Sequence, residues 1–186
     1  SITSIGSGAF KGCSSLESMT IPFVGGSRKT ASDTYQYPFG YIFGTSSYTG
    51  GKSTEQYYYG SSTSYSTYNT YYIPETLKSV TITGGNILYG AFYGCSSLKT
   101  IDIPVGVTEI REYTFYNCSS LTSIKIPSSV TSIQKSAFSG CSGLTSVVIP
   151  NKVTSIGSNA FAGCNDVESI YALNTKAITC DESIFA

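Results

Sequence analysis

The sequence contains no histidine, and charged residues make up only 12% of its 186 positions. Without histidine the chain lacks the commonest general base, the Ser–His and Cys–His pairs of nucleophilic enzymes, and histidine-bearing zinc sites. The 11 basic residues balance the 11 acidic ones, which argues against a nucleic-acid module because such modules need a basic face for phosphates. No apolar run approaches the roughly 20 residues that cross a bilayer, so we expect no membrane insertion.

What the sequence does contain is an internal repeat. Four cysteines recur every 23 residues: Cys95, Cys118, Cys141 and Cys164. The residues around them recur in the pattern LxxIxIPxxVxxIxxxxFxxC, with consecutive copies over 98–118, 121–141 and 144–164. This period lies within the roughly 20–29 residues of leucine-rich repeats and far below the roughly 40 of a propeller blade. The spacing therefore predicts a solenoid of stacked coils.

Each copy of the pattern has a physical interpretation. The LxxIxI segment alternates with period two, which is typical of a short strand with one buried face. A proline such as Pro127 ends the strand because proline cannot donate to a ladder. A small residue and phenylalanine, such as Ala137–Phe138, then favour a short helical turn. One coil buries too little apolar surface to offset its ordering entropy, so coils must stack. The predicted fold class is a β-rich solenoid of α/β type with short parallel strands.

The repeat weakens toward both ends, and one segment interrupts it. The copies predict about seven coils in a single domain over residues 1–186, and both ends fall within a coil, which indicates a piece of a longer array. Residues 23–76 hold no clean copy but eleven of the sixteen tyrosines. We interpret them as one irregular coil with excursions at about 24–38 and 45–72, and FGYIFG at 39–44 as a degenerate phenylalanine turn. A disordered linker is the alternative, although linkers seldom carry so many aromatics.

The pattern LxxIxIPxxVTSIxxxAFxxCSSL resembles the BspA-like leucine-rich repeats over residues 1–22 and 77–172, and VTSIGSNAFAGC at 153–164 is similar to the family's consensus. The interrupting segment is similar to an irregular unit in such proteins from gut Firmicutes. The resemblance implies a curved right-handed leucine-rich-repeat superhelix on a large secreted or surface-anchored bacterial protein. It also implies roles in adhesion, host-protein binding and co-aggregation.

The cysteine ladder is the first candidate site. On stacked coils Cys95, Cys118, Cys141 and Cys164 would lie parallel, about 4.8 Å apart, so neither a tetrahedral metal site nor disulfides between neighbours fit without distortion. We expect a structural column of buried free thiols that behave as small hydrophobes, and no metal. Cys180 lies off this ladder, and a free thiol, a reactive thiol and a pairing with another part of the protein remain open.

Outward strand positions and the tyrosine-rich segment are the candidate binding surfaces. One outward column varies from coil to coil and includes Asp102, Lys125, Val148 and Tyr171, as a recognition surface would, although a decorated scaffold is the alternative. The tyrosines offer flat faces and hydroxyls for sugars or peptides, or they cover the flank of the irregular coil. Four of them are the candidate contacts: Tyr57, Tyr58, Tyr59 and Tyr71.

Taken together, these features predict a non-enzymatic interaction or adhesion module, extracellular or anchored to the cell surface, that presents a rigid repeat surface to a protein partner. We expect no cofactor and no nucleic-acid partner, and we expect the chain to be a monomer. Two alternatives remain open. One is a carbohydrate-binding module that uses the tyrosine-rich segment, and the other is a passive spacer within a large surface protein.

Overall fold

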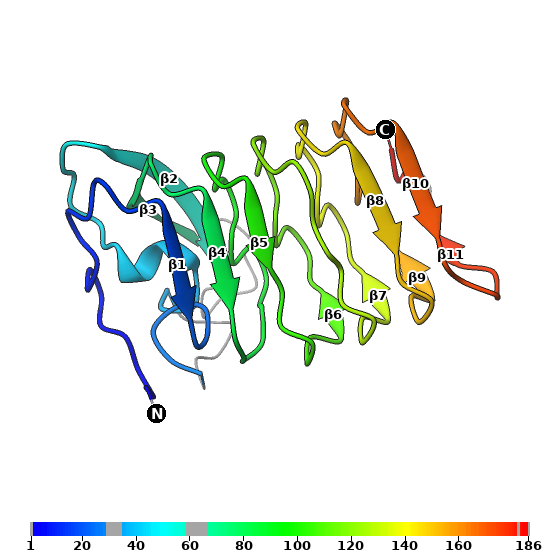
Figure 1. Cartoon of the computed structure of the whole chain (residues 1–186), viewed down its shortest axis with the longest axis horizontal. Helices are drawn as coiled ribbons and strands as arrows, with labels where there is room; N and C mark the ends of the chain where they lie inside the picture. Colours follow the sequence, from blue (N-terminus) through cyan, green and yellow to red (C-terminus); the bar gives the residue numbers. More distant parts are fainter. Residues whose placement is uncertain (1, 29–34, 59–66, 182, 186) are drawn as a thin grey trace.

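A computed structural model describes residues 2–28, 35–58, 67–181 and 183–185 of the chain. Its coils lie side by side along one axis in sequence order (Figure 1). Residues one repeat apart are direct neighbours: the amide of Thr131 donates to the carbonyl of Thr108, and that of Thr154 to the carbonyl of Thr131, both at 2.8 Å. The predicted β-solenoid is confirmed.

Most LxxIxI segments form parallel strands along one side of the solenoid, whereas the segment at 121–126 contributes only an isolated bridge at Lys125. β1 (Ser18–Ile21), β4 (Ser79–Ile82) and β5 (Thr100–Asp102) make one sheet in that order, and β8 (Ser146–Ile149) pairs with β10 (Ser169–Ala172). Equivalent repeat positions face each other across every pair. Because side chains alternate along a strand, one set packs into the core and the other forms an exposed surface, which we call the strand face.

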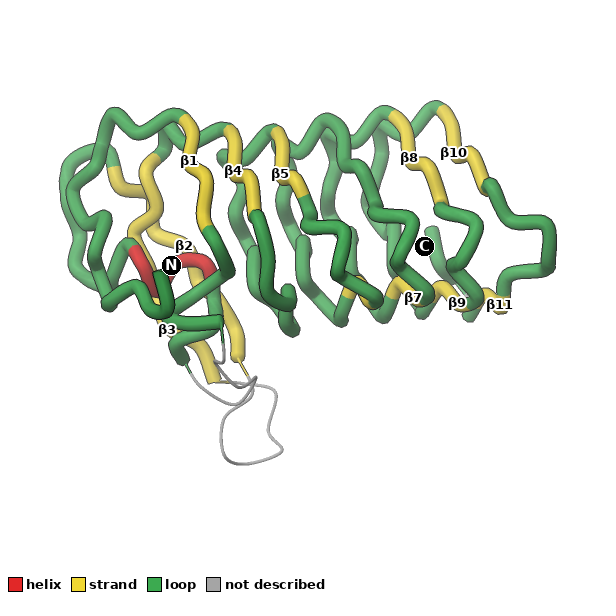
Figure 2. Tube along the Cα trace, turned by 60° about the horizontal axis from the view of Figure 1, so that its bottom comes forward, coloured by secondary structure: helices red, strands yellow, loops and turns green. Residues whose placement is uncertain are grey.

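A second set of short strands follows along another side of the coils, below the strand face in Figure 2. β6 (Glu109–Ile110), β7 (Ser132–Ile133), β9 (Ser155–Ile156) and β11 (Thr179–Cys180) form a parallel sheet with one strand from each of four successive coils. The Ala–Phe segments between coil sides form consecutive hydrogen-bonded turns rather than regular helices. Within the described ranges the single helix is a 3₁₀ helix, η1 (Phe39–Ile42).

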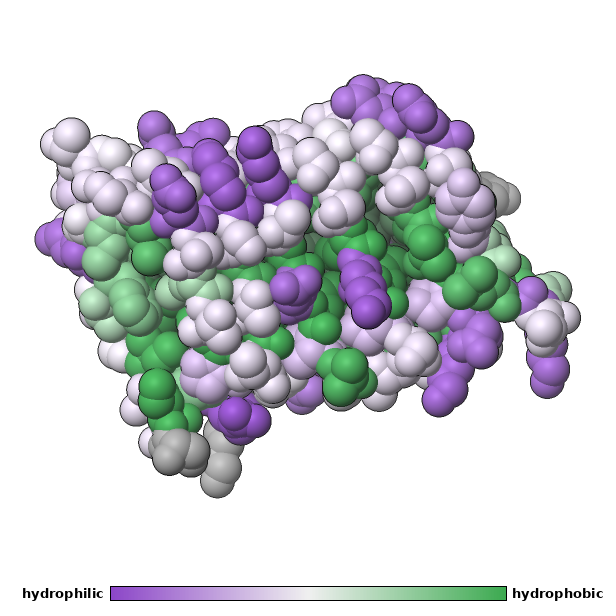
Figure 3. All heavy atoms as spheres, in the orientation of Figure 1, coloured by the Kyte–Doolittle hydropathy of each residue, from purple (hydrophilic) through white to green (hydrophobic). Residues whose placement is uncertain are grey.

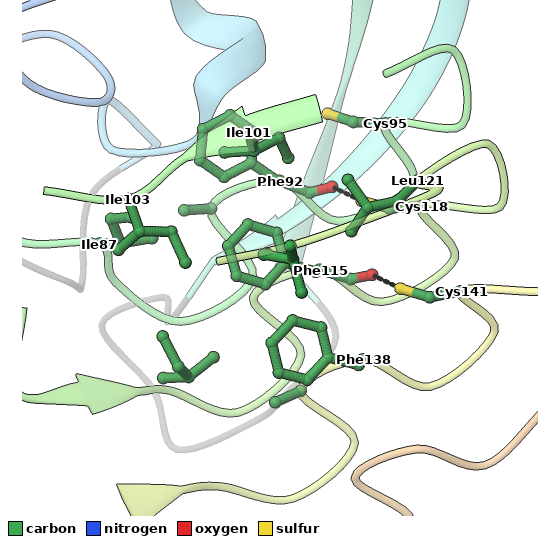
Figure 4. Close-up of a cluster of buried hydrophobic side chains, with 14 of the residues drawn as sticks. Ile87, Phe92, Cys95, Ile101, Ile103, Phe115, Cys118, Leu121, Phe138 and Cys141 are labelled. Carbon is green, nitrogen blue, oxygen red and sulfur yellow. Dashed lines mark hydrogen bonds between the residues drawn. The ribbon is translucent and has the colours of Figure 1, made fainter. Parts of the chain in front are cut away.

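A column of phenylalanine rings runs through the core from coil to coil. Neighbouring ring centroids lie 4.9–6.2 Å apart. In order along the axis the members are Phe10, Phe43, Phe39, Phe92, Phe115, Phe138, Phe161 and Phe185. Figure 4 shows three of the rings stacked between the aliphatic side chains of the two strand sides. The backbone follows the same repeat, since the amide of Phe115 donates to Ala137 O at 2.9 Å in the next coil.

The interrupting segment joins this column through η1, which supplies both Phe39 and Phe43. The FGYIFG sequence thus takes the place of a phenylalanine turn in the ring column, as predicted. After it the chain forms an antiparallel hairpin of β2 (Gly51–Tyr58) and β3 (Thr67–Pro74), which the sequence analysis did not predict and which fills most of the second predicted excursion. Residues 29–34 and 59–66 lie outside the described ranges.

One buried amide side chain attaches the hairpin to the solenoid. Gln56 in β2 accepts a hydrogen bond from the amide of Gly40 at 2.5 Å, and its Nε2 donates to Tyr93 O at 3.1 Å and to Ala91 O at 3.3 Å. These contacts connect the hairpin with η1 and with the first regular phenylalanine turn. The hairpin therefore has a defined position against the coil at 87–97.

Candidate binding surfaces

The variable outward column lies on the strand face as the spacing predicts. Asp102 forms an isolated parallel bridge with Lys125, and Val148 in β8 lies directly opposite Tyr171 in β10. The Asp102 carboxylate accepts a hydrogen bond from the Thr81 hydroxyl at 3.0 Å. Among the described residues the single ion pair is elsewhere, so Asp102 and Lys125 do not form a salt bridge.

Apolar side chains are exposed at the β8–β10 end of this face. Val148 is 42% exposed and Tyr171 is 58% exposed, and Ile170 and Leu173 beside them are exposed as well. In Figure 3 hydrophobic surface lies between polar side chains along the middle of the view, and one such area lies toward β8 and β10. The strand face thus combines a serine- and threonine-rich area, two separated charges and an apolar end.

The thiol ladder is part of the core rather than of a surface. Cys95, Cys118 and Cys141 are buried, and Cys164 is partly buried. The thiols of Cys118 and Cys141 donate hydrogen bonds of 3.2 and 3.1 Å to phenylalanine carbonyls one coil earlier (Figure 4). Cys164 repeats this contact with Phe138 O at 3.2 Å. Beyond filling space as hydrophobes, the thiols therefore satisfy backbone acceptors.

Burial also determines the protonation of these thiols. It raises the pKa of Cys164 to about 11 and holds the pKa values of Cys95, Cys118 and Cys141 well above the usual range. A protonated thiol is a poor nucleophile and a poor metal ligand. Cys13 and Cys180 are exposed and unpaired in the structure. Within the described ranges no three histidine, cysteine, aspartate or glutamate side chains gather as a metal site would require.

The tyrosine-rich segment divides into core and surface residues. Tyr71 is only 1% exposed, and its hydroxyl donates to the carbonyl of Tyr35 at 2.7 Å. The prediction of Tyr71 as a binding residue is therefore wrong, because its ring packs against Gly40 in the core. Tyr57 and Tyr58 are partly exposed at the end of β2, and Tyr59 lies outside the described residues.

Tyr57 borders an open hollow of about 450 Å³ between the hairpin and the turns of three regular coils. We call it the tyrosine hollow, and its lining consists of Tyr57, Tyr89, Tyr93, Glu112, Tyr113 and Lys135. Glycines let the hairpin approach this closely. A Cβ atom on Gly90 would lie 3.1 Å from the carbonyl of Tyr57, and one on Gly94 would lie 3.3 Å from Thr54 Cγ2. The Tyr37 hydroxyl donates to the same carbonyl of Tyr57 at 3.2 Å.

Ring contacts fix the tyrosines of the hollow. The centroid of Tyr93 lies 4.8 Å from that of Tyr57 and 4.8 Å from that of Tyr116, on which it stacks. Tyr89 meets Tyr113 edge to face at 5.5 Å. Burial raises the pKa of Tyr93 to about 12, so its phenol stays protonated and keeps its donor at neutral pH. The hollow thus presents neutral aromatic faces and hydroxyls held in place by their neighbours.

Tyr113 has an unusual backbone for so large a side chain. Its φ is +56°, in the left-handed region. The same repeat position holds Gly90, Ser136 and Asn159 in other coils, all with φ between +52° and +59°. Left-handed backbone costs roughly 1–2 kcal/mol for a residue with a Cβ atom, and asparagine and glycine tolerate it best. Only one of these coils places an aromatic ring there, and that ring lines the hollow.

Most of the hollow escaped the sequence analysis, which considered the tyrosines of residues 23–76 and Tyr171 on the strand face. Tyr89, Tyr93 and Tyr113 belong to the regular coils instead. A signal was present, since Tyr93 and Tyr116 occupy one repeat position that holds Ser139 and Ala162 in the following coils. When a repeat position is aromatic in two neighbouring coils and small in the others, the pattern indicates a local binding surface.

The stacked coils, the parallel sheets and the periodic leucine, isoleucine and phenylalanine core define a leucine-rich-repeat solenoid. The family model described as BspA type leucine rich repeat region matches residues 1–81 and 63–186, with six copies. The chain belongs to this family. Six copies are one fewer than the approximately seven coils that the sequence analysis predicted. A comparison with curated proteins gives no match.

Solved structures of bacterial leucine-rich-repeat proteins are similar to parts of the chain. A leucine-rich repeat protein from Bacteroides ovatus shares 33% identity over 55% of this chain and 30% of its own, with a TM-score of 0.50. A leucine rich cell surface protein from Faecalibacterium prausnitzii shares 32% identity over 54% of this chain and 34% of its own, with a TM-score of 0.44. The T. pallidum leucine rich repeat protein shares 22% identity over 55% of this chain and 72% of its own, with a TM-score of 0.42. The chain spans about a third of the length of the first two proteins.

None of the helices in the described part of the chain has the length and apolar character needed to span a membrane.

Proposed function

We propose that this chain is a non-enzymatic interaction module, displayed outside the cell, whose strand face binds a protein partner. The extracellular location rests on the family to which the chain belongs. The proposal of a protein partner rests on one observation. Val148 and Tyr171 are exposed neighbours, and they continue the outward column that contains the charged residues Asp102 and Lys125.

These exposed apolar and charged side chains fit a protein partner better than a polyanion. An apolar patch beside isolated charges of both signs is typical of protein interfaces, where aromatic residues dominate the binding energy. A polyanion would need a continuous basic surface. Successive coils hold the column in a fixed arrangement, so the chain loses little conformational entropy when a partner binds.

The experiment compares the chain with two triple variants. K125A/V148S/Y171S changes three side chains of the varied column and keeps Asp102, and the control S123A/S146A/S169A alters the neighbouring outward column of small residues. Surface plasmon resonance measures the binding of both variants and of the unmodified chain to an array of purified extracellular proteins. We expect at least one array protein to bind, with an affinity lowered about 30-fold or more by the first variant and unchanged by the control.

Two results would contradict the proposal. If no array protein binds the folded chain, the chain is a passive spacer. If the control weakens a bound partner as much as K125A/V148S/Y171S does, the varied column is not the contact surface. Circular dichroism melting of all three proteins confirms that each is folded.

A further inference from the structure

We propose that the tyrosine hollow is a second, separate binding site, and that it takes one or two sugar units of an uncharged glycan. The hollow lies between the hairpin and the phenylalanine turns, and none of its lining residues belongs to the strand face. The inference is therefore independent of the protein partner proposed above.

The size of the hollow suits a ligand rather than a single solvent molecule. About 450 Å³ lies within the roughly 300–1,000 Å³ of small-molecule sites in proteins. The hollow is open to solvent, so a sugar unit could enter while the rest of a glycan chain continues outward.

The lining defines the chemistry of the ligand. Four tyrosines supply flat faces with hydroxyls at their edges, and a sugar ring likewise has an apolar C–H face and a rim of hydroxyls. Glu112 is an acceptor with about four lone-pair positions, and Lys135 is a donor with three hydrogens. Hydroxyl groups both donate and accept, so a neutral polyol can use both residues.

The two charged residues also exclude simpler ligands. A cation bound among the tyrosine rings would be drawn to Glu112 but repelled by Lys135, and an anion would meet the reverse. None of the described residues of the lining is aliphatic, which disfavours a purely apolar ligand. An uncharged ligand with both apolar faces and hydroxyls fits the whole lining.

The site is rigid before a ligand arrives. Tyr93 is held between Tyr57 and Tyr116, and the hairpin that carries Tyr57 is fastened by the buried Gln56. Ordered rings lose little entropy on binding, which favours affinity. The left-handed backbone at Tyr113 belongs to the repeat, but an aromatic ring at this position does not, because the equivalent residues are Gly90, Ser136 and Asn159.

The test uses a variant that should fold at least as well as the unmodified chain. Tyr113→Asn places at the left-handed position the residue that Asn159 already provides in a later coil. The matched control is Tyr171→Ser, which removes an exposed tyrosine from the strand face. The probes are a glycan array with neutral and sialylated oligosaccharides, and choline and inorganic phosphate as simple ions. Isothermal titration calorimetry measures the binding of sugar in solution.

We expect neutral glycans to bind, Tyr113→Asn to weaken their binding at least 10-fold, and Tyr171→Ser to leave it unchanged. Glu112→Gln should weaken binding as well, because an amide oxygen is a poorer acceptor than a carboxylate. The proposal would be overturned if no array glycan binds, if only sialylated glycans or the simple ions bind, or if folded Tyr113→Asn retains full affinity.

Discussion

The side-chain oxygen of Gln56 accepts a hydrogen bond of 2.5 Å from the backbone amide of Gly40, sixteen residues earlier in the chain. Both groups are buried, and the amide nitrogen of Gln56 donates to Ala91 O and Tyr93 O in the next coil. One side chain thus joins η1, the hairpin and the first regular coil, where elsewhere in the solenoid backbone groups of neighbouring coils join directly.

Replacing Gln56 by leucine should therefore destabilise the fold markedly. The change keeps a side chain of similar size but leaves the Gly40 amide and the Tyr93 carbonyl without this partner, while the Ala91 carbonyl still accepts from the Phe39 amide at 2.8 Å. Each such group costs about 1–3 kcal/mol, so we expect a loss of at least 2 kcal/mol in the free energy of unfolding measured with urea. The control is Glu55→Gln on the exposed side of the same strand, which should change stability by less than about 0.5 kcal/mol. Equal effects of the two changes would contradict the assigned role of Gln56.

The phenylalanine column predicts a contrast between its middle and its last member. Phe138 is fully buried between Phe115 and Phe161, whereas Phe185 is 52% exposed. We expect Phe138→Ala to lower the free energy of unfolding by about 3–5 kcal/mol through lost burial and a cavity. Phe185→Ala should cost less than half as much. Thermal or urea unfolding of the two variants measures the difference. A similar loss of stability for both would mean that burial in the phenylalanine column does not determine the stability of the core.

Glycine positions offer a test of the close contact between η1 and the hairpin. A Cβ atom on Gly40 would lie 2.5 Å from the Cβ and Cγ atoms of Tyr71, while one on Gly106 would meet nothing within 4 Å. Gly40→Ala should therefore destabilise by about 1–3 kcal/mol through overpacking. Gly106→Ala should be within about 0.5 kcal/mol of the unmodified chain. If Gly40→Ala is tolerated as well as Gly106→Ala, Tyr71 does not cover η1 as described.

The buried thiols should make stability fall in alkali. The ordinary thiol pKa is 9.0, and burial raises that of Cys164 to about 11. Between these values the unfolded thiol ionises while the folded one stays protonated, so the unfolded state gains and the free energy of unfolding decreases with rising pH. Below pH 9 this contribution is fully present.

Urea unfolding at pH values below 9 and approaching 11 measures this slope. Cys164→Ala should make it shallower, and Cys180→Ala, at an exposed site, should leave it unchanged. A Cys164→Ala variant with the full alkaline loss would show that this thiol is not protected by the fold. Tyr71 and Tyr93, whose pKa values burial raises to about 12, act in the same direction above pH 10 in all three proteins.

The repeating part of the structure could be predicted because its signal is periodic. A spacing of 23 residues places each leucine, isoleucine, phenylalanine and cysteine above its equivalent, and this alone determines which side chains are buried. The strand-face column followed from the same spacing, with Val148 directly opposite Tyr171.

The hairpin and the hollow could not be predicted in the same way. The residues of β2 that face the solenoid are Thr54 and Gln56, which are polar, so the strand shows no alternation of apolar and polar residues. Gln56 is buried only because backbone groups far away in the sequence bind it. The position of Tyr57 beside Tyr93 depends on that attachment, and no local pattern encodes it.

The constant length of 23 residues in the regular coils affects how the genes of such proteins can gain or lose repeats. Loss of residues 98–120 would join Ser97 to Leu121, and Leu121 would occupy the place of Leu98 with the phenylalanine rings still stacked. The same loss would remove Glu112 and Tyr113 and with them part of the tyrosine hollow. Duplication or deletion of whole 23-codon units thus preserves the stacking of the coils. Between Gly94 and Lys135 it would not preserve the hollow, because an inserted unit would carry Tyr113 or Lys135 one coil away from Tyr93.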